Sequence, residues 1–268
     1  MNELLILVPI LLVSGVVAGL LAGLLGVGGG IVIVPMLYHI FIYMKIDISI
    51  AMPLAIGTSL STIVVTSIIS ARSHHKKGGI DWDLSKRWIP FVILGVFIGA
   101  FSSKFIDGNN LKFMFGILLL LVSINMIISS FKTLVIAKSL PGKFGQSIFA
   151  TLLGGFASLL GIGGGTLMVP LLSLYSFPIH RAVSTASLFG LIISIPATIS
   201  YIVVGWNIEN LPLASTGYVN WLAFAVLVPM TMFFAPYGVK LAYKLNVKQL
   251  KFAFSIFLAC VGLKMLIV

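Results

Sequence analysis

The stretch LLGVGGGIVIVPML at residues 24–37 places four glycines and a proline inside an otherwise apolar run. The stretch LLGIGGGTLMVPLL at residues 159–172 repeats it, with nine of the fourteen positions identical. A run of glycines permits a sharp change of backbone direction, because glycine readily adopts positive φ. The two stretches therefore predict two apolar helices, each broken near its glycines and followed by a short second helical piece.

The composition places these breaks in a membrane protein. Hydrophobic residues make up 59% of the 268 residues, charged residues make up 9%, and the mean hydropathy is +1.17. Soluble domains carry about 25% charged residues, so this chain has too few charges to cover a soluble fold. We interpret it as an all-α polytopic membrane protein with the lipid bilayer as its partner. The net charge of +11 then reflects basic cytoplasmic loops and not a nucleic-acid partner.

Ten apolar segments follow one another along the chain, in two sets of five. They cover about residues 4–25, 30–43, 50–71, 88–105, 111–131, 145–160, 165–177, 182–204, 217–239 and 251–268. LKFMFGILLLLVSINMII at 111–128 recurs as LKFAFSIFLACVGLKMLI at 250–267, and IGTSL at 56–60 matches STASL at 184–188. The sequence predicts a first transmembrane repeat at 1–131, a basic cytoplasmic linker at 132–143 and a second repeat at 144–268.

The distribution of basic residues predicts how the repeats enter the membrane. Thirteen of the seventeen Lys and Arg residues lie in alternate loops, at 72–87, 132–143, 178–181 and 240–251. The positive-inside rule assigns these loops to the cytoplasm and both termini to the outside. Five segments is an odd number, so the second repeat is inverted relative to the first. This holds whether each Gly-broken pair crosses the bilayer or forms a re-entrant hairpin, and the sequence leaves both open.

The broken helices predict a binding site for an anion. A helix that begins inside the membrane exposes N–H groups without helical partners, and its dipole favours negative charge there. In an inverted repeat, two such helix starts can meet at a shared site near the midplane. The alternative is close helix packing, for which glycine is common in transmembrane segments. The residues predicted to contact the substrate here are Gly28, Gly29, Gly30, Gly163, Gly164, Gly165 and Thr166.

Hydroxyl groups at the start of the third segment of each repeat extend this predicted site. Thr58 and Ser59 lie in the first repeat, and Thr185 and Ser187 lie at the equivalent point of the second. Hydroxyls bind an oxyanion without a full charge, although helix–helix hydrogen bonding explains the same residues. Arg181 precedes the second hydroxyl motif, where it either collects anions or is a cytoplasmic-loop charge.

Titratable side chains are scarce at membrane depth. All six acidic residues fall at segment ends or in loops, which argues against a carboxylate-based cation carrier and suits an anion carrier. His39 follows the first glycine break and is either a proton-linked residue or a packed neutral histidine. His74 and His75 are interpreted as part of a solvated loop, because their spacing to nearby acids fits no metal template. The single cysteine, Cys260, excludes a cysteine metal cluster, and no metal or cofactor is expected.

These residues resemble the TauE/SafE sulfite-exporter family of membrane permeases. The resemblance rests on LLGVGGGIVIVPML with IGTSL and on LLGIGGGTLMVPLL with HRAVSTASL, and it covers essentially the whole chain. It implies a plasma-membrane transporter of prokaryotic type for sulfur-containing anions such as sulfite or organosulfonates. The chain departs from the family at Leu54, which occupies the position in the first motif that Arg181 occupies in the second. A cation often seen at this position is therefore missing from one repeat.

We therefore expect a secondary transporter that moves sulfite or an organosulfonate by alternating access, in the export direction. Outward movement of an anion from a negative interior is downhill by about 2.3 kcal/mol per charge and 100 mV. The alternative is an anion channel, with a continuous pore through the same inverted halves. The chain has no recognisable catalytic set, so no enzymatic activity is expected, and the sequence leaves a homo-oligomer open.

Overall fold

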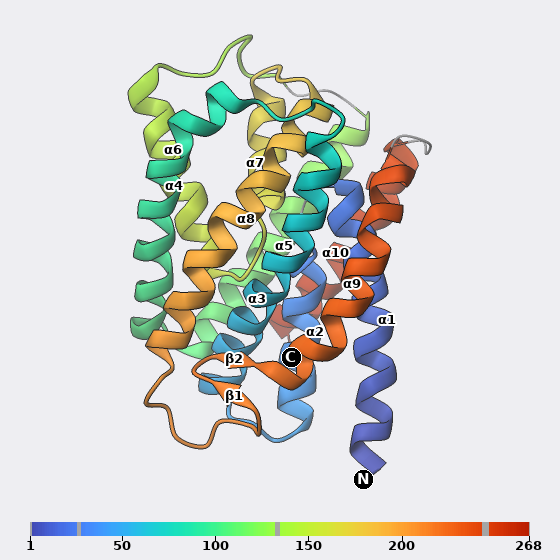
Figure 1. Ribbon diagram of the computed structural model, residues 1–268, viewed down its shortest axis with the longest axis vertical. Coiled ribbons are helices and arrows are strands. Elements are labelled where there is room, and N and C mark those ends of the chain that lie inside the picture. The colour runs from blue at the N-terminus through green and yellow to red at the C-terminus, as the bar shows by residue number, and fades with distance from the viewer. Residues whose placement is uncertain (1, 26–27, 132–134, 243–246, 268) are drawn as a thin grey trace.

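The computed structural model describes residues 2–25, 28–131, 135–242 and 247–267. In this part of the chain, helices account for most of the backbone (Figure 1). They are α1 (Asn2–Leu25), α2 (Gly30–Tyr43), α3 (Ile48–His75), α4 (Trp82–Ser102), the 3₁₀ turn η1 (Ser103–Phe105), α5 (Gly108–Phe131), α6 (Lys143–Leu159), α7 (Gly165–Leu174), α8 (Ile179–Val204), α9 (Trp221–Ala242) and α10 (Val247–Ile267). Two short strands, β1 (Ser215–Thr216) and β2 (Val219–Asn220), precede α9.

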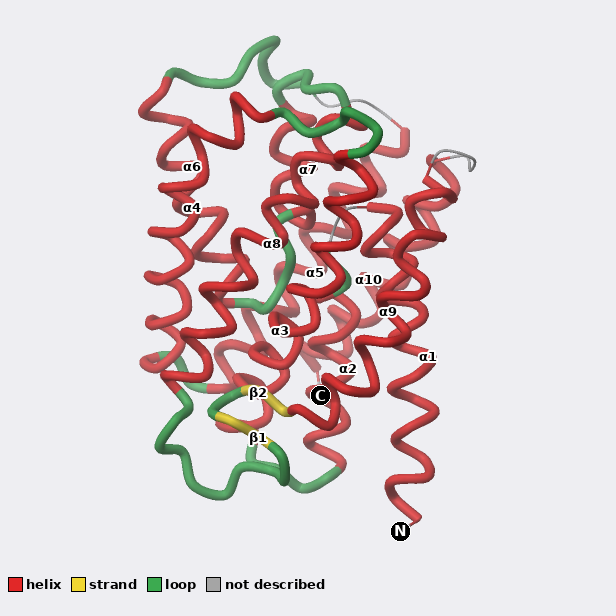
Figure 2. The backbone as a smooth tube through the Cα atoms, viewed as in Figure 1, coloured by secondary structure: helices red, strands yellow, loops and turns green. Residues whose placement is uncertain are grey.

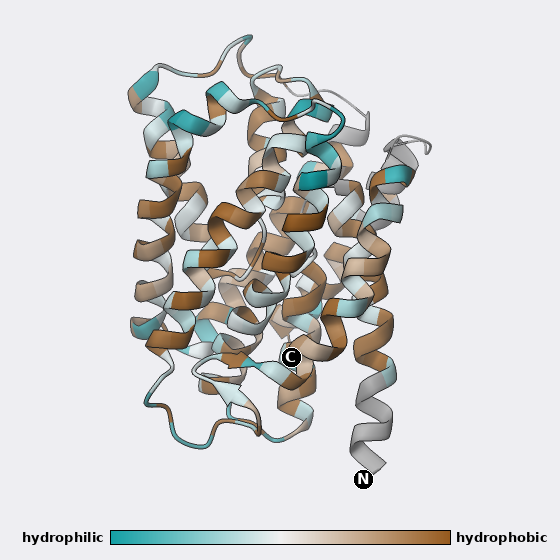
Figure 3. Ribbon diagram, viewed as in Figure 1, coloured by the Kyte–Doolittle hydropathy of each residue, from teal (hydrophilic) through white to brown (hydrophobic). Residues whose placement is uncertain are grey.

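The helices have the length and the surface of membrane-spanning segments. Among the described residues, five helices are long and apolar enough to cross a bilayer: α3, α4, α5, α8 and α9. Large apolar side chains such as Val13, Leu121 and Leu222 are more than half exposed. Strongly hydrophilic residues collect toward the ends of the bundle (Figure 3). Helices satisfy their backbone groups internally, as lipid requires. The predicted all-α polytopic membrane protein is confirmed.

Both predicted breaks interrupt the helical order. α1 ends at Leu25 and α2 begins at Gly30, while α6 ends at Leu159 and α7 begins at Gly165. α2 has 14 residues and α7 has 10, short of the roughly 20 residues of a full span. Figure 2 shows the loop between α6 and α7 at mid-height among the helices. Non-helical backbone is thus enclosed by protein and kept from lipid.

α3 and α8 form the centre of the bundle. The most apolar stretch of α3 is 72% buried and that of α8 is 50% buried, against 39% for α4, α5 and α9. Leu60 of α3 and Phe189 and Tyr201 of α8 are fully buried. The hydroxyl motifs predicted to face a substrate therefore lie on the two most enclosed of the long helices.

The most extensive helix contacts between the two halves of the chain are those of α1 with α9, α4 with α6, α5 with α10 and α3 with α8. Glycines bring two of these pairs close together. A Cβ on Gly23 of α1 would overlap the Ala235 carbonyl of α9, and a Cβ on Gly154 of α6 would overlap the Val92 carbonyl of α4. When the helices of each half are numbered one to five, the first helix of either half contacts the fourth of the other. Such pairing is expected of two related halves, and the inverted repeat itself stays a prediction.

The structure differs from the predicted segments near the loops. α3 extends to His75 and α4 begins at Trp82, so residues 76–81 separate them where the sequence predicted a loop at 72–87. The charged side chains of Lys86 and Arg87 are exposed on the first turns of α4, and charges at helix ends lower local hydropathy without ending the helix. The antiparallel pairing of β1 with β2 was not predicted.

Candidate functional site

The two glycine breaks touch each other inside the bundle. A Cβ on Gly28 would lie 3.3 Å from the Cα of Gly163, and a Cβ on Gly30 would overlap the carbonyl oxygen of Gly161. Gly28 and Gly29 have φ of +76° and +83°, a left-handed conformation that residues with a Cβ adopt only at a cost. The structure therefore brings the two predicted breaks together in direct backbone contact.

Two buried hydroxyls of α3 bind the carbonyl groups of the breaks. Ser59 Oγ donates to the Gly161 carbonyl at 2.9 Å. Thr66 Oγ1 lies 3.2 Å from the Gly28 carbonyl and equally close to the Thr62 and Ile63 carbonyls of its own helix, which share its single proton. Ser59 was predicted at the site, and it does reach the break. Thr66 was not predicted, because it lies two turns beyond the IGTSL motif, outside the stretch in which the sequences of the two halves match.

Thr166 is a predicted site residue whose polar atom is unused. It lies in the first turn of α7, is 2% exposed, and its Oγ1 has no hydrogen-bond partner among the described residues. Gly164, the N-cap of α7, packs against α8, where a Cβ would lie 2.9 Å from the Cβ of Phe189. Gly165 begins the helix. An unsatisfied buried hydroxyl costs about 1–3 kcal/mol, and an oxyanion is a partner that would relieve this cost.

Thr58 and Thr185 each hydrogen-bond to a loop of the opposite half of the chain. Thr58 Oγ1 accepts the backbone N–H of Asn220, and Thr185 Oγ1 accepts that of Asp81, both at 2.9 Å. The side chains of Asn220 and Asp81 in turn accept a backbone N–H from the first turns of α9 and α4. Each threonine therefore fixes the start of a helix that belongs to the other half of the chain.

The two capping residues belong to loops of matching sequence. We call them the GGIDW loop (residues 78–82) and the GYVNW loop (residues 217–221). Each begins with a glycine of positive φ, +67° at Gly78 and +53° at Gly217. The shared pattern of glycine, a β-branched residue, Asx and tryptophan was a signal in the sequence, but it was not among the matched stretches from which the repeats were predicted.

Arg181 forms an ion pair with Asp81 of the GGIDW loop. Its guanidinium lies 3.3 Å from the carboxylate, and the two side chains are 54% and 17% exposed. In this conformation the charge of Arg181 is therefore engaged with a loop. Ser187, two residues after Thr185, donates its hydroxyl proton to the Ser184 carbonyl at 2.7 Å. Among the residues that the structure describes, neither Arg181 nor Ser187 is hydrogen-bonded to a break.

The interpretation of His74 as part of a solvated loop is wrong. His74 lies in the last turn of α3 and is 2% exposed, because α8 packs over it: its Nδ1 is 3.2 Å from Ser184 Oγ. His75 is exposed, with its ring edge toward Trp82. His39 is half-buried in α2 beside Tyr38, and its Nε2 has no hydrogen-bond partner among the described residues.

His74 ends a series of polar residues on one face of α3, which we call the α3 polar line. Its members recur at every fourth position and are all buried: Thr58, Thr62, Thr66, Ser70 and His74. Residues four apart on a helix lie on the same face. At about 1.5 Å per residue, the line extends about 24 Å. It therefore passes from the GYVNW loop, beside the first glycine break, to the end of α3 near the GGIDW loop.

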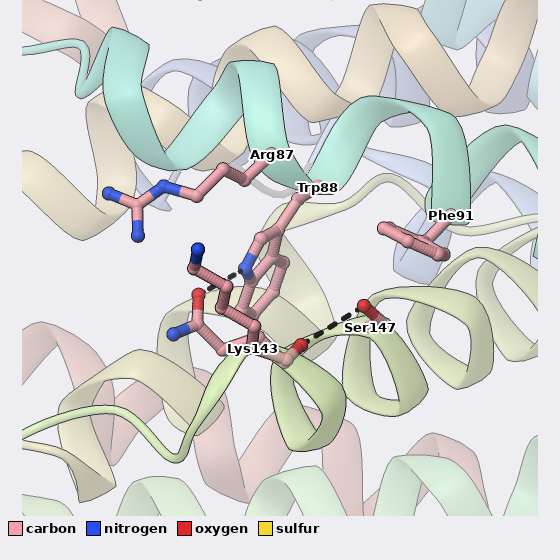
Figure 4. A pocket seen from close by; sticks show the side chains of 6 residues that line it. Arg87, Trp88, Phe91, Lys143 and Ser147 are labelled. Atoms are coloured by element: carbon pink, nitrogen blue, oxygen red, sulfur yellow. Dashed lines mark hydrogen bonds between the residues drawn. The ribbon is translucent and has the colours of Figure 1, made fainter.

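A pocket elsewhere on the molecule is lined by α4 and α6. Arg87, Trp88 and Phe91 come from α4, and Lys143 and Ser147 from α6 (Figure 4). The Trp88 indole N–H donates to the Gln146 side chain at 3.1 Å. The pocket lies near the start of both helices and contains no predicted site residue. The described residues contain no group of three or more His, Cys, Asp or Glu side chains that could hold a metal ion.

Comparisons with known proteins agree with one another. The family model described as "Sulfite exporter TauE/SafE" matches residues 11–265. A probable membrane transporter protein of Haemophilus influenzae is 34% identical over 255 residues, which cover 95% of this chain and 96% of the relative. Another of Methanocaldococcus jannaschii, MJ0441, is 33% identical and covers 99% and 97%, and YunE of Bacillus subtilis is 30% identical and covers 96% of both chains. No solved structure matches the chain.

Proposed function

Because the chain belongs to the TauE/SafE sulfite exporter family and is a membrane transporter, we propose that it carries sulfite or an organosulfonate across the plasma membrane. The observation that carries this proposal is the contact between the two glycine breaks in the middle of the bundle. Two short helices begin there, and helix starts attract anions through free N–H groups and the helix dipole. The unpartnered Thr166 hydroxyl adds a donor that a small oxyanion would use.

The proposed substrate contacts are the glycines at the two breaks together with Ser59 and Thr166. Ser59 now donates to a carbonyl, and its proton can turn to an anion when the breaks separate. Thr58 and Thr185 take a different role in this proposal, because their hydroxyl oxygens hold the two loops. No deep carboxylate repels a negative substrate, since all six acidic residues lie at helix ends or in loops.

Alternating access follows from the paired loops. The GGIDW loop closes one end of the central α3–α8 pair, and the GYVNW loop closes the other. Rocking of the two halves would release one loop while the other stays bound, so that the site opens to one side at a time. The helix pairing between the halves and the matched threonine contacts support the inverted repeat on which this movement depends.

The proposed orientation puts the basic end in the cytoplasm and both termini outside. The N-terminus and residues 205–216 lie at one end of the bundle, and residues 135–142 lie at the other (Figure 1). The second end carries Lys76, Lys77, Lys86 and Arg87, which the positive-inside rule assigns to the cytoplasm. With a negative interior, the membrane potential favours export of an anion that moves alone.

A flux assay with purified protein in proteoliposomes tests the proposal. Labelled sulfite and methanesulfonate are loaded inside, and their release is followed with and without the same anion outside. A carrier should show saturable flux that external substrate accelerates by exchange. Single-channel currents in a planar bilayer would instead identify an anion channel, and absence of flux for both anions would overturn the proposed substrate class.

A further inference from the structure

His74 is a buried titratable side chain that the proposed anion site does not use. It is 2% exposed, and the loop after α3 folds back on it. The backbone N–H groups of Lys77 and Gly79 both donate to the His74 carbonyl, at 3.1 and 3.3 Å. A Cβ on Gly79 would overlap Ser184 Oγ, so the loop lies directly on the serine that contacts the imidazole ring. The GGIDW loop therefore helps to separate His74 from water.

Ser184 determines which ring nitrogen of His74 carries the proton. Ser184 Oγ lies 2.7 Å from the His180 carbonyl oxygen and 3.2 Å from His74 Nδ1. A carbonyl oxygen only accepts, so the single hydroxyl proton of Ser184 points to it. Ser184 Oγ must then accept a hydrogen bond from the ring. Neutral His74 consequently holds its proton on Nδ1 and has a lone pair on Nε2.

The Nε2 atom of His74 is buried and has no hydrogen-bond partner among the described residues. Ser70 lies one turn before His74 on the same face of α3, is 2% exposed, and its Oγ has no partner in the described part of the chain. An acceptor and a donor with unused polar atoms therefore lie one helical turn apart on one face of α3.

We propose that His74 binds a proton at Nε2 and, with the Ser70 hydroxyl, forms a second station for the transported oxyanion at the end of the α3 polar line. This inference rests on the proposed function. When the GGIDW loop lifts from α8, a proton from water bonds to Nε2, and the ring changes from neutral to singly positive. The anion then meets a hydrogen-bond donor on each residue and a balancing charge. Loss of the proton to water on release of the anion returns the ring to its neutral form.

The charges around His74 make protonation depend on the anion. Lys77 in the following turn carries a positive charge, and His180 on α8 is a second titratable side chain near the ring. Arg181 of α8 is paired with Asp81 of the loop, and the described side chains of α1 include no titratable group. An oxyanion at the station adds a negative charge that favours the positive form of the ring. By linkage, the anion raises the affinity for the proton by the same factor as the proton raises the affinity for the anion, commonly about 5- to 150-fold.

Nitrogen NMR on the full-length protein tests the proton site without any need for transport. The chain has four histidines, so a protein with ¹⁵N-labelled histidine gives few signals, and His74→Gln identifies the one in question. We expect neutral His74 to carry its proton on Nδ1, with a bare Nε2. Addition of methanesulfonate, which keeps one negative charge throughout, should move protonation of Nε2 to higher pH. A neutral ring with its proton on Nε2, or a titration that saturating methanesulfonate leaves unchanged, would overturn the inference.

Flux of methanesulfonate in proteoliposomes tests the coupling. Between about pH 5 and pH 8, where histidine titrates, wild-type flux should fall at least about fivefold as pH rises, and a pH dye should record protons that move with the anion. His74→Gln should retain flux but lose both responses. His75→Gln, an exposed neighbour, is the matched control and should behave as wild type. Retention of the pH profile in His74→Gln, or its loss in His39→Gln instead, would overturn the assignment.

The same vesicles separate this inference from the proposed function. With one proton per monovalent anion no net charge moves, so a potassium diffusion potential should leave the flux unchanged. Flux that follows the potential and moves no protons would support sulfonate export while it overturns the role of His74. A wild-type protein that moves neither sulfite nor methanesulfonate would overturn the proposed function. The tautomer measured by NMR would then decide the proton site by itself.

Discussion

The GGIDW loop and the GYVNW loop close opposite ends of the bundle with the same backbone device and different charges. In both, a glycine of positive φ is followed by a buried β-branched residue and then by a residue that caps a helix. The backbone N–H of this capping residue donates to a threonine of the other half. Asp81 of the first loop also pairs with Arg181. At the second loop Asn220 replaces the acid, and Leu54 occupies the position equivalent to Arg181. The shared parts are what closure requires, and the ion pair is an addition at one end.

Burial separates the two loops further. Asn220 is 5% exposed, and its side chain donates to the Leu213 carbonyl and to Ser215 Oγ in addition to capping α9. Burial raises the pKa of the neighbouring Tyr218 hydroxyl, so this loop gains no titrating group near neutral pH. The GGIDW loop instead combines a partly exposed ion pair with the enclosed His74 beneath it. We therefore expect the basic end to respond to pH and salt, and the other end to respond to neither.

The largest expected effect on flux comes from substitutions at the glycine breaks. The two halves of the chain contact each other there, and both loops close over that contact. Gly29→Val places a branched side chain at φ +83° against the Ala18 carbonyl, and Gly164→Val places one against Phe189. A displacement of about 1 Å at a site can cost about 100-fold in rate, so we expect each variant to lose flux by about this factor. The measurement is labelled-sulfite flux per amount of protein found in the membrane.

Gly142→Val is the matched control for these variants. A Cβ at Gly142 meets nothing within 4 Å, and its φ of −56° suits any residue, so flux should stay near the wild-type value. Full flux in both break variants would contradict the glycine site. Gly29→Ala and Gly164→Ala sharpen the comparison between the halves. Only Gly29 is left-handed, so alanine should be the more harmful there.

Much of this architecture could be predicted from the sequence, because apolar segments and glycine runs act locally. A helix must be apolar to lie in lipid, so hydropathy found all ten helices and both breaks. The loop predicted at 72–87 is shorter in the structure, since charged residues continue both helices into the interface. Local composition indicates which residues form a helix in lipid, but it does not indicate at which charged residue the helix ends.

The contacts of the site could not be predicted, because they depend on which helices meet. Thr58 and Thr185 were expected to donate to an anion, whereas their oxygens accept backbone N–H groups from the opposite half. His74 lies among charged and polar neighbours in the sequence and was therefore predicted to lie in a loop, yet α8 covers it. A hydroxyl is both donor and acceptor, so its sequence position does not specify which role it takes. Only the packing of the two halves assigns it.

A smaller effect is expected from removal of the threonine acceptors. Thr58→Val leaves the buried Asn220 N–H without a partner, at a cost of about 1–3 kcal/mol, which corresponds to roughly 2–4 °C in Tm per kcal/mol for a chain of this size. Thr185→Val should lower Tm less, because Asp81 is partly exposed and water can replace the hydroxyl. Thermal unfolding in detergent measures both. Serine at either position should restore most of the loss, and a larger loss in Thr185→Val would reverse the ranking of the two ends.

The smallest effect on stability is expected from removal of the ion pair. This variant tests whether the pair is needed to hold the basic end closed. Arg181→Leu with Asp81→Asn gives the basic end the residue types of the other end. An exposed ion pair contributes about 0.2–1 kcal/mol, so Tm should fall by less than in Thr58→Val. The wild-type Tm should fall by a similar amount in about 1 M salt, which screens exposed charges, and the double variant should be insensitive to that salt. Because the hydroxyl contact with Thr185 remains, closure should persist and flux should change by no more than about threefold. A loss of stability greater than that of Thr58→Val would mean that charge, and not the shared backbone device, holds the basic end closed.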